Sequence, residues 1–211
     1  MILAIKDRHI VVDLDGTLIE EGAPYVILFK KLLFREPVVI VGAVIAYLIL
    51  GPNIFTSNLV KSKMNLLNLD SPSLLEIKFN KPLVNLLKNL KKAGKVLILA
   101  TGSDQCVAEA ISNMLYKHFH IKFEHIIGSK PGFVCISNNK LEQIRLLTND
   151  FVYIGNSYQD LPIWLASGVD VICIGSTQFY QMIEYRLNKP GYLMRPEFEL
   201  VRDMIPKLGA S

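Results

Sequence analysis

The chain has 211 residues, 51% of them hydrophobic, and a net charge of +4. This length suits one large domain or one domain with an insertion, and the hydrophobic share is ample for a core. The mild charge, without an arginine-rich run, argues against a nucleic-acid-binding protein. Three widely spaced cysteines, Cys106, Cys135 and Cys173, predict core residues in a reducing, cytoplasmic compartment rather than disulfides or a metal site.

The first informative stretch, residues 11–18, reads Val-Val-Asp-Leu-Asp-Gly-Thr-Leu. Its β-branched start predicts a buried strand, and ligands bind at the carboxyl ends of strands in open α/β sheets. Asp13 and Asp15 are two residues apart, so an extended backbone points both carboxylates the same way, and Gly16 lets the chain turn away. Neighbouring carboxylates repel each other unless a cation lies between them. The pair therefore predicts a hard divalent ion such as Mg²⁺.

The next segment, residues 19–81, shows little alternation and several helical patterns. We therefore predict a helical insertion there and a core domain made of residues 1–18 and 82–211. Pro82 suits the first turn of a core helix, and Gly94 suits its end. Within the insertion, the helical patterns cover residues 24–34, 38–50 and 56–69.

Residues 38–50 contain no charge and follow the basic residues Lys30, Lys31 and Arg35. As a helix they would measure about 20 Å, short of the ~30 Å hydrocarbon thickness, so no membrane span is predicted. The favoured interpretation is a buried helix of the insertion. The alternatives are contact with a membrane surface through residues 25–55, for which the basic flank is suited, and dimerisation.

Beyond residue 95, short apolar runs alternate with helical patterns. This alternation predicts a parallel sheet with helices on both faces and all strand carboxyl ends on one rim. The predicted strands cover residues 96–100, 123–127, 133–136, 151–154 and 169–174. The predicted helices cover residues 104–116, 140–147, 159–166 and 178–187. Residues 188–211 are predicted to form the edge of the domain or a linker.

Polar residues follow two more of the predicted strands. Thr101, Gly102 and Ser103 end the first, where a hydroxyl and backbone amides can donate to a phosphate group. Asn156 and Asp160 follow the strand at residues 151–154, and both carry the oxygen ligands that magnesium prefers. The sequence thus gathers phosphate-binding and metal-binding groups on one rim.

Taken in order, these motifs resemble those of the haloacid dehalogenase (HAD) superfamily, and its phosphatase branch in particular. The resemblance implies a Rossmannoid α/β core, with the insertion as a small helical cap of the C1 type. It implies that Asp13 is the nucleophile and Asp15 the general acid and base. It also implies that Thr101, with Gly102 and Ser103, binds the substrate phosphate.

The resemblance further implies a lysine that neutralises the nucleophile and the transferred phosphoryl group. Lys140 is the stronger candidate because it begins the helix that leads into the strand at residues 151–154. Lys130, in a turn-rich loop, is the alternative.

The fourth motif departs from the family pattern, because Asn156 stands where the family has its first aspartate. Carried over by position, the Mg²⁺ ligands are Asp13, Asp15, Asn156 and Asp160. An amide oxygen can ligate magnesium but brings no charge. We therefore expect weaker magnesium binding, by about 10–100-fold if Asn156 behaves like other losses around a metal site.

These observations predict a magnesium-dependent phosphomonoesterase with an aspartyl-phosphate intermediate. The run from Asn156 to Trp164 also resembles HAD modules fused to membrane prenyltransferases. The apolar, basic-flanked insertion is similar to that of a HAD-type bacterial effector, a membrane-associated phosphotyrosine phosphatase. The substrate is thus a phosphotyrosine protein or a small phosphorylated metabolite, at a cytoplasmic or membrane-peripheral location. The alternative from another class is a catalytically degenerate binding module, which Asn156 suggests.

Overall fold

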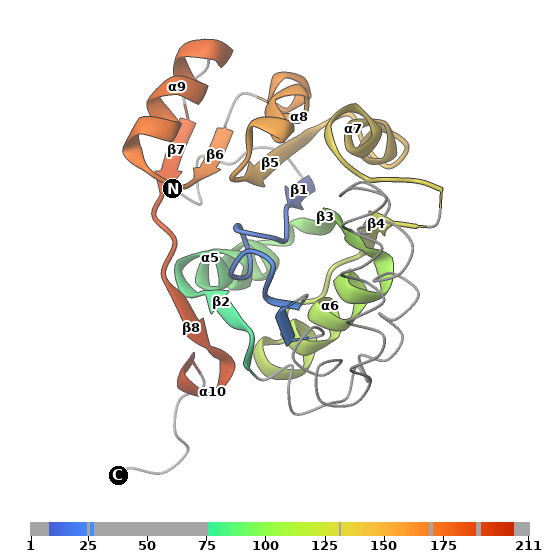
Figure 1. Cartoon of the computed structure of the whole chain (residues 1–211), viewed down its shortest axis with the longest axis vertical. Coiled ribbons are helices and arrows are strands. Elements are labelled where there is room, and N and C mark those ends of the chain that lie inside the picture. Colours follow the sequence, from blue (N-terminus) through green and yellow to red (C-terminus); the bar gives the residue numbers. More distant parts are fainter. Residues whose placement is uncertain are drawn as a thin grey trace, which may run out of the picture.

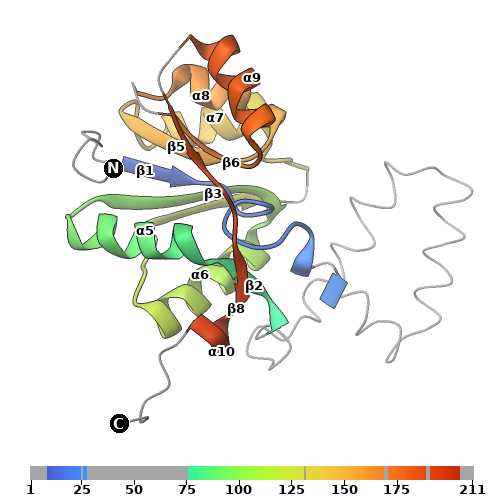
Figure 2. The same ribbon diagram turned by 90° about the vertical axis from the view of Figure 1, so that its left-hand side faces the viewer.

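The architecture is a parallel sheet between two layers of helices (Figures 1 and 2). The computed structural model describes residues 9–24, 26–27, 76–130, 132–168, 171–188 and 191–204. The predicted insertion lies largely outside these residues, as do its helical patterns at 38–50 and 56–69 and most of the proposed membrane contact at 25–55. No helix within the described residues is long and apolar enough to cross a membrane.

Six strands form the main sheet, in the order β4-β3-β1-β5-β6-β7, and every neighbouring pair is parallel. The strands are β1 (His9–Val12), β3 (Val96–Asp104), β4 (His125–Ser129), β5 (Phe151–Gly155), β6 (Val171–Ile174) and β7 (Gly191–Met194). The predicted α/β class with a parallel sheet is confirmed. Because β1 lies between β3 and β5, the motifs that follow these three strands meet at one edge of the sheet.

The helices divide between the two faces of the sheet, as Figure 2 shows. α5 (Lys81–Lys92) and α6 (Gln105–Phe119) cover one face, while α7 (Ser137–Arg145), α8 (Leu161–Ala166) and α9 (Thr177–Leu187) cover the other. The alternation of β1 matches this division. Ile10 and Val12 pack in the cluster with α5 and α6, and Val11 packs in the cluster with α7, α8 and α9.

A second, smaller sheet lies beside the core. It pairs β2 (Lys78–Asn80) antiparallel with β8 (Phe198–Leu200), which is followed by α10 (Val201–Met204). Ile19 forms a bridge with Phe79, and both side chains are fully buried in the core cluster with Ile77. The described residues at both edges of the predicted insertion therefore pack with the core domain.

Two expectations from the sequence need correction, one about a strand and one about a cysteine. Residues 133–136 were expected to form a strand, but they form a loop in which Phe133 exchanges backbone hydrogen bonds with Lys130. The loop doubles back instead of extending because Gly132 adopts a positive φ of 78° in the turn. Of the three cysteines, Cys135 and Cys173 are buried as expected, whereas Cys106 is only partly buried at the first turn of α6.

Candidate active site

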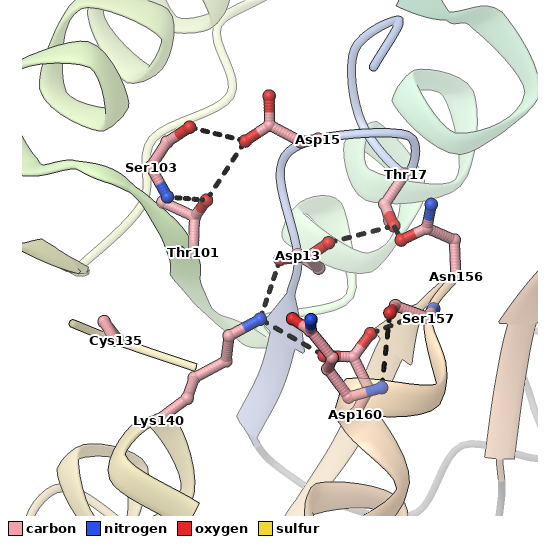
Figure 3. A network of polar contacts seen from close by, with 12 residues as sticks. Asp13, Asp15, Thr17, Thr101, Ser103, Cys135, Lys140, Asn156, Ser157 and Asp160 are labelled. Carbon is pink, nitrogen blue, oxygen red and sulfur yellow. Dashed lines mark hydrogen bonds and ion pairs between the residues drawn. The ribbon is translucent and has the colours of Figure 1, made fainter. Parts of the chain in front are cut away.

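Asp13 lies at the centre of the polar cluster shown in Figure 3. It directly follows β1, and its backbone N–H donates to the carbonyl of Ile154 on β5 at 2.9 Å, which continues the ladder past the strand end. The residue as a whole is only 6% exposed. The middle of the sheet therefore fixes this carboxylate before any ligand binds.

The sharp turn after Asp15 depends on Gly16. This residue has a backbone φ of +68°, which residues other than glycine rarely adopt. A Cβ at this position would also lie 2.1 Å from Nδ2 of Asn156. The predicted role of Gly16 as the turning point is thus explained by two independent requirements. The turn also brings the backbone of residue 16 against Asn156, which follows β5.

Lys140 contacts the predicted nucleophile. Its Nζ donates to Oδ1 of Asp13 at 2.9 Å and to Oδ1 of Asp160 at 3.2 Å. The lysine is 4% exposed, in the first half of α7, where Leu141 and Ile144 anchor the helix in the core. Lys130 is exposed in the turn with Phe133. The structure thus places Lys140, the favoured candidate, beside Asp13.

Tyr153 completes this part of the site, and sequence reasoning missed it. Its buried hydroxyl accepts from Lys140 Nζ at 3.0 Å and donates to Asp160 Oδ1 at 2.7 Å. Its ring meets Trp164 edge to face at 5.9 Å. A tyrosine in a buried strand is usually interpreted as part of the core, but its position two residues before Gly155 sets its hydroxyl at the sheet edge.

Asp160 is held from several directions. Its Oδ1 accepts from Lys140 and Tyr153, and its Oδ2 accepts from the backbone N–H of Ser157 at 3.2 Å. Gly155 allows this approach, since a Cβ there would lie 2.6 Å from Asp160 Oδ2. The carboxylate is 2% exposed and orients the lysine.

Burial and charge perturb the ionisable groups in this cluster. Burial is the main cause that raises the pKa of Asp13 to about 7, against the opposing effect of Lys140. Burial alone would lower the pKa of Lys140, but Asp13 and Asp160 raise it well above its usual range. The two carboxylates beside Lys140 thus favour its charged form.

Thr17 joins Asp13 to Asn156. Its buried hydroxyl lies 3.0 Å from Oδ1 of Asn156 and 3.3 Å from Oδ2 of Asp13, so both oxygens point toward this one hydroxyl group. Within the described residues, no cluster of three or more His, Cys, Asp or Glu side chains is arranged to hold a metal ion. The convergent carboxylate and amide oxygens nevertheless fit a hard cation such as Mg²⁺, which binds few protein ligands and keeps several waters.

Asp15 lies on the opposite side of Asp13 from Asp160, beside β3 (Figure 3). Its Oδ2 accepts from the hydroxyl of Ser103 at 2.6 Å, and the hydroxyl of Thr101 lies 3.5 Å from the same oxygen. The other oxygen, Oδ1, is buried and has no hydrogen-bond partner among the described residues. The structure thus brings all the predicted site residues of three strand ends into one cluster.

Comparison at the level of sequence finds a curated relative but no family model. No family model matches the chain. An uncharacterised protein of Sinorhizobium fredii is 26% identical over 187 residues, which cover 88% of this chain and 33% of that protein. The chain therefore spans about a third of the length of this curated relative.

Several solved structures share the architecture. A predicted phosphatase from Clostridium acetobutylicum is 16% identical with a TM-score of 0.56, and covers 90% of this chain and 94% of its own. A haloacid dehalogenase-like hydrolase from Streptococcus pneumoniae is 18% identical over the same shares, with a TM-score of 0.54. A phosphoserine phosphatase is 16% identical, covering 84% and 91%, with a TM-score of 0.53. The fold is haloacid dehalogenase-like. This agrees with the resemblance found in the sequence motifs.

Proposed function

We propose that the protein is a magnesium-dependent phosphomonoesterase that forms an aspartyl-phosphate on Asp13. The observation that carries this proposal is the buried contact of 2.9 Å between Lys140 Nζ and Asp13 Oδ1, with Asp15 two residues further along the chain. A fixed ammonium group beside a carboxylate nucleophile lets the dianionic phosphate group approach it. The HAD-like fold with its phosphatase neighbours supports the same chemistry.

In the first step, a carboxylate oxygen of Asp13 attacks phosphorus, and the bond from phosphorus to the ester oxygen breaks. Asp15 gives its proton to the leaving oxygen, so an alcohol departs. Lys140 neutralises the charge that builds up on the phosphoryl oxygens, and the hydroxyl of Thr101 and the backbone N–H of Gly102 bind those oxygens.

In the second step, Asp15 takes a proton from a water molecule, whose oxygen attacks phosphorus. The bond from phosphorus to Asp13 breaks, which releases inorganic phosphate and restores both carboxyl groups. Asp160 and Tyr153 hold Lys140 in place throughout, since both contact its ammonium group.

Asp13 and Asn156 are the side chains we expect to hold Mg²⁺, because each places an oxygen within reach of the same Thr17 hydroxyl and both oxygens are of the kind that magnesium prefers. The ion would supply positive charge that screens the nucleophile and the phosphoryl group from each other. Of the other predicted ligands, Asp160 is engaged with Lys140, and Asp15 with Ser103. We therefore propose that Asp15 acts mainly in proton transfer and that Asp160 mainly orients Lys140.

The proposed reaction defines the substrate only as a phosphate monoester. Phosphotyrosine proteins and small phosphorylated metabolites are the two candidates, with the predicted cap at residues 19–81 and the membrane contact at 25–55 as features that would favour a protein substrate at a membrane surface. A panel of phosphotyrosine peptides, phosphoserine peptides and sugar phosphates separates them. Failure on phosphotyrosine alone would end the protein-tyrosine phosphatase hypothesis.

Hydrolysis of p-nitrophenyl phosphate, with magnesium or with EDTA, tests the main proposal. We expect magnesium-dependent activity in the natural protein and none in Asp13→Asn. The matched control is Asp150→Asn, which removes an exposed carboxylate before β5 and should keep full activity. Acid quenching and peptide mapping should find phosphate on Asp13. Inactivity of the natural protein on every ester at high magnesium would instead support the binding module that Asn156 suggests.

A further inference from the structure

The end of β3 does not follow the regular ladder. Ala100 pairs with Ile127, but the next pair is Asp104 with Ser129, so three residues of β3 oppose one residue of β4. Such a bulge bends a strand and changes the direction of its side chains. Thr101 and Ser103 are the outer two of these three residues of β3, and both hydroxyls reach Asp15 (Figure 3).

The neighbouring strand holds the bulge in shape. Ser129 donates its hydroxyl to the carbonyl of Gly102 at 2.6 Å, and the side chain of Gln105 accepts from the N–H of Gly128 at 2.7 Å. Gly128 leaves room for the bulge, since a Cβ there would lie 3.1 Å from the carbonyl oxygen of Ser103 and 2.8 Å from the backbone nitrogen of Gln105. The position of Ser103 is therefore fixed by its surroundings.

The two hydroxyls differ in what they do. Thr101 Oγ1 accepts from the N–H of Ser103 at 3.0 Å and lies 3.5 Å from Asp15, a long contact that leaves its proton available to a phosphate oxygen. Ser103 Oγ lies 2.6 Å from Asp15 Oδ2, the length of a strong hydrogen bond from a hydroxyl to a carboxylate. Ser103, which the sequence predicted to bind phosphate, is committed to Asp15.

This hydrogen bond distinguishes the two oxygens of Asp15. Oδ2 accepts from Ser103, while Oδ1 is buried and has no partner among the described residues. A buried polar oxygen without a partner is costly, and in a native protein it points to a ligand or a catalytic role. Oδ1 is therefore the oxygen of Asp15 that no hydrogen bond from a described residue occupies.

We propose that Ser103 is a positioning residue: its hydroxyl holds the Asp15 carboxyl group by Oδ2 so that Oδ1 meets the leaving oxygen of the ester. This inference rests on the proposed phosphatase function and deepens it. It separates the two hydroxyls on the bulge, since Thr101 serves the phosphate and Ser103 serves proton transfer.

The test compares two esters that differ in their need for an acid. The p-nitrophenolate anion leaves without a proton, whereas an alkyl phosphate such as glycerol phosphate needs one. In Ser103→Ala we expect kcat/KM for the alkyl ester to fall by about 10–100-fold, within the range of general acid catalysis, and that for p-nitrophenyl phosphate by less than about threefold. Ser103→Cys, of similar size but with a weak donor, should show the same selective loss.

The controls separate this role from a structural one. Thr101→Ala should lower kcat/KM for both esters alike, and Ser112→Ala, which removes a buried hydroxyl from α6, should change neither. An equal loss on both esters in Ser103→Ala, with weaker inhibition by inorganic phosphate, would overturn the proposal and make Ser103 a phosphate ligand. Inactivity of the natural protein on both esters would overturn the phosphatase proposal itself.

Discussion

The two sides of Asp13 are built in different ways. On the charged side, Lys140, Tyr153 and Asp160 are all nearly or fully buried and are linked by hydrogen bonds of 2.7 to 3.2 Å. On the hydroxyl side, Asp15 is partly exposed, and its Oδ2 accepts from the hydroxyls of Thr101 and Ser103, while its Oδ1 has no hydrogen-bond partner among the described residues. The polar groups of the charged side are hydrogen-bonded without a ligand, whereas on the hydroxyl side Oδ1 of Asp15 has no partner within the residues that the structure describes.

This difference matches two tasks in the proposed reaction. Stabilising the charge of a phosphoryl group is most effective when the compensating cation is already in place, so that nothing has to reorganise during the reaction. Transferring a proton requires an oxygen that can exchange partners. A network as fully bonded as the charged side would hinder that exchange, and Oδ1 of Asp15 accordingly has no hydrogen-bond partner in the described part of the chain.

The largest expected effect comes from removing the cation of the charged side. Lys140→Met keeps the length of the side chain but leaves Asp13 and Asp160 buried without their common partner. Breaking a buried ion pair on one side costs about 3–5 kcal/mol of stability. The pKa of Asp13, already raised by burial, should rise further, and phosphatase activity should be lost. Urea unfolding and p-nitrophenyl phosphate hydrolysis measure the two effects.

Lys91→Met is the matched control for this variant. Lys91 forms an ion pair with Glu124, but its side chain is 32% exposed, and such surface pairs contribute little. We expect a loss of less than about 1 kcal/mol and unchanged activity. Equal losses of stability in the two variants would show that the buried network gives no special stabilisation to the charged side.

A smaller effect is expected where Asn156 faces Asp13. Asn156→Asp keeps the shape that fits against Gly16 but adds a negative charge near Asp13. Magnesium should then bind about 10–100-fold more tightly, whereas the protein in EDTA should be less stable than the natural one because the two carboxylates repel each other. Melting temperatures with magnesium and with EDTA measure both effects.

Asn113→Asp, on the exposed face of α6, controls for the added charge. It should leave the difference between the melting temperatures in magnesium and in EDTA as in the natural protein. If Asn156→Asp behaved in the same way, Asn156 would not face the ion, and the proposed ligand pair would be wrong.

The sequence predicted the centre of the main sheet better than its last strand, β7, and the separate small sheet. The runs before Asp13 and at residues 151–154 are buried on both faces, so their apolar character is visible without a structure. β2, β7 and β8 are three or four residues long and mostly half-buried. β2 and β8 pair with each other although they are distant in the chain. Local patterns carry no signal for such pairing.

The site divides in the same way. Lys140 was predicted from the family resemblance, which implies a lysine at the start of the helix before β5, and the structure places its Nζ 2.9 Å from Oδ1 of Asp13. The role of Ser103 was not found, because it depends on a bulge whose register is set by Gly128 and Ser129 on another strand. Tyr153 was missed because its hydroxyl contacts Lys140, which α7 places beside the strand, and this contact is not visible in the sequence.

The smallest effect sharpens the comparison most directly, because it changes the charged side without changing its charge. Tyr153→Phe keeps the ring against Trp164 but removes the hydroxyl between Lys140 and Asp160. Hydrogen bonds to charged groups contribute about 1.5–3 kcal/mol, and Lys140 and Asp160 keep their direct contact, so we expect a loss of about 1–2 kcal/mol. kcat should fall severalfold with KM nearly unchanged, because a displaced Lys140 acts mainly on the transition state.

Tyr180→Phe is the matched control. The Tyr180 hydroxyl bonds Glu184 and the carbonyl of Gly191, outside the candidate site, so its loss should change stability alone. A fall in kcat of the same size in both variants would mean that Tyr153 supports the fold rather than the lysine.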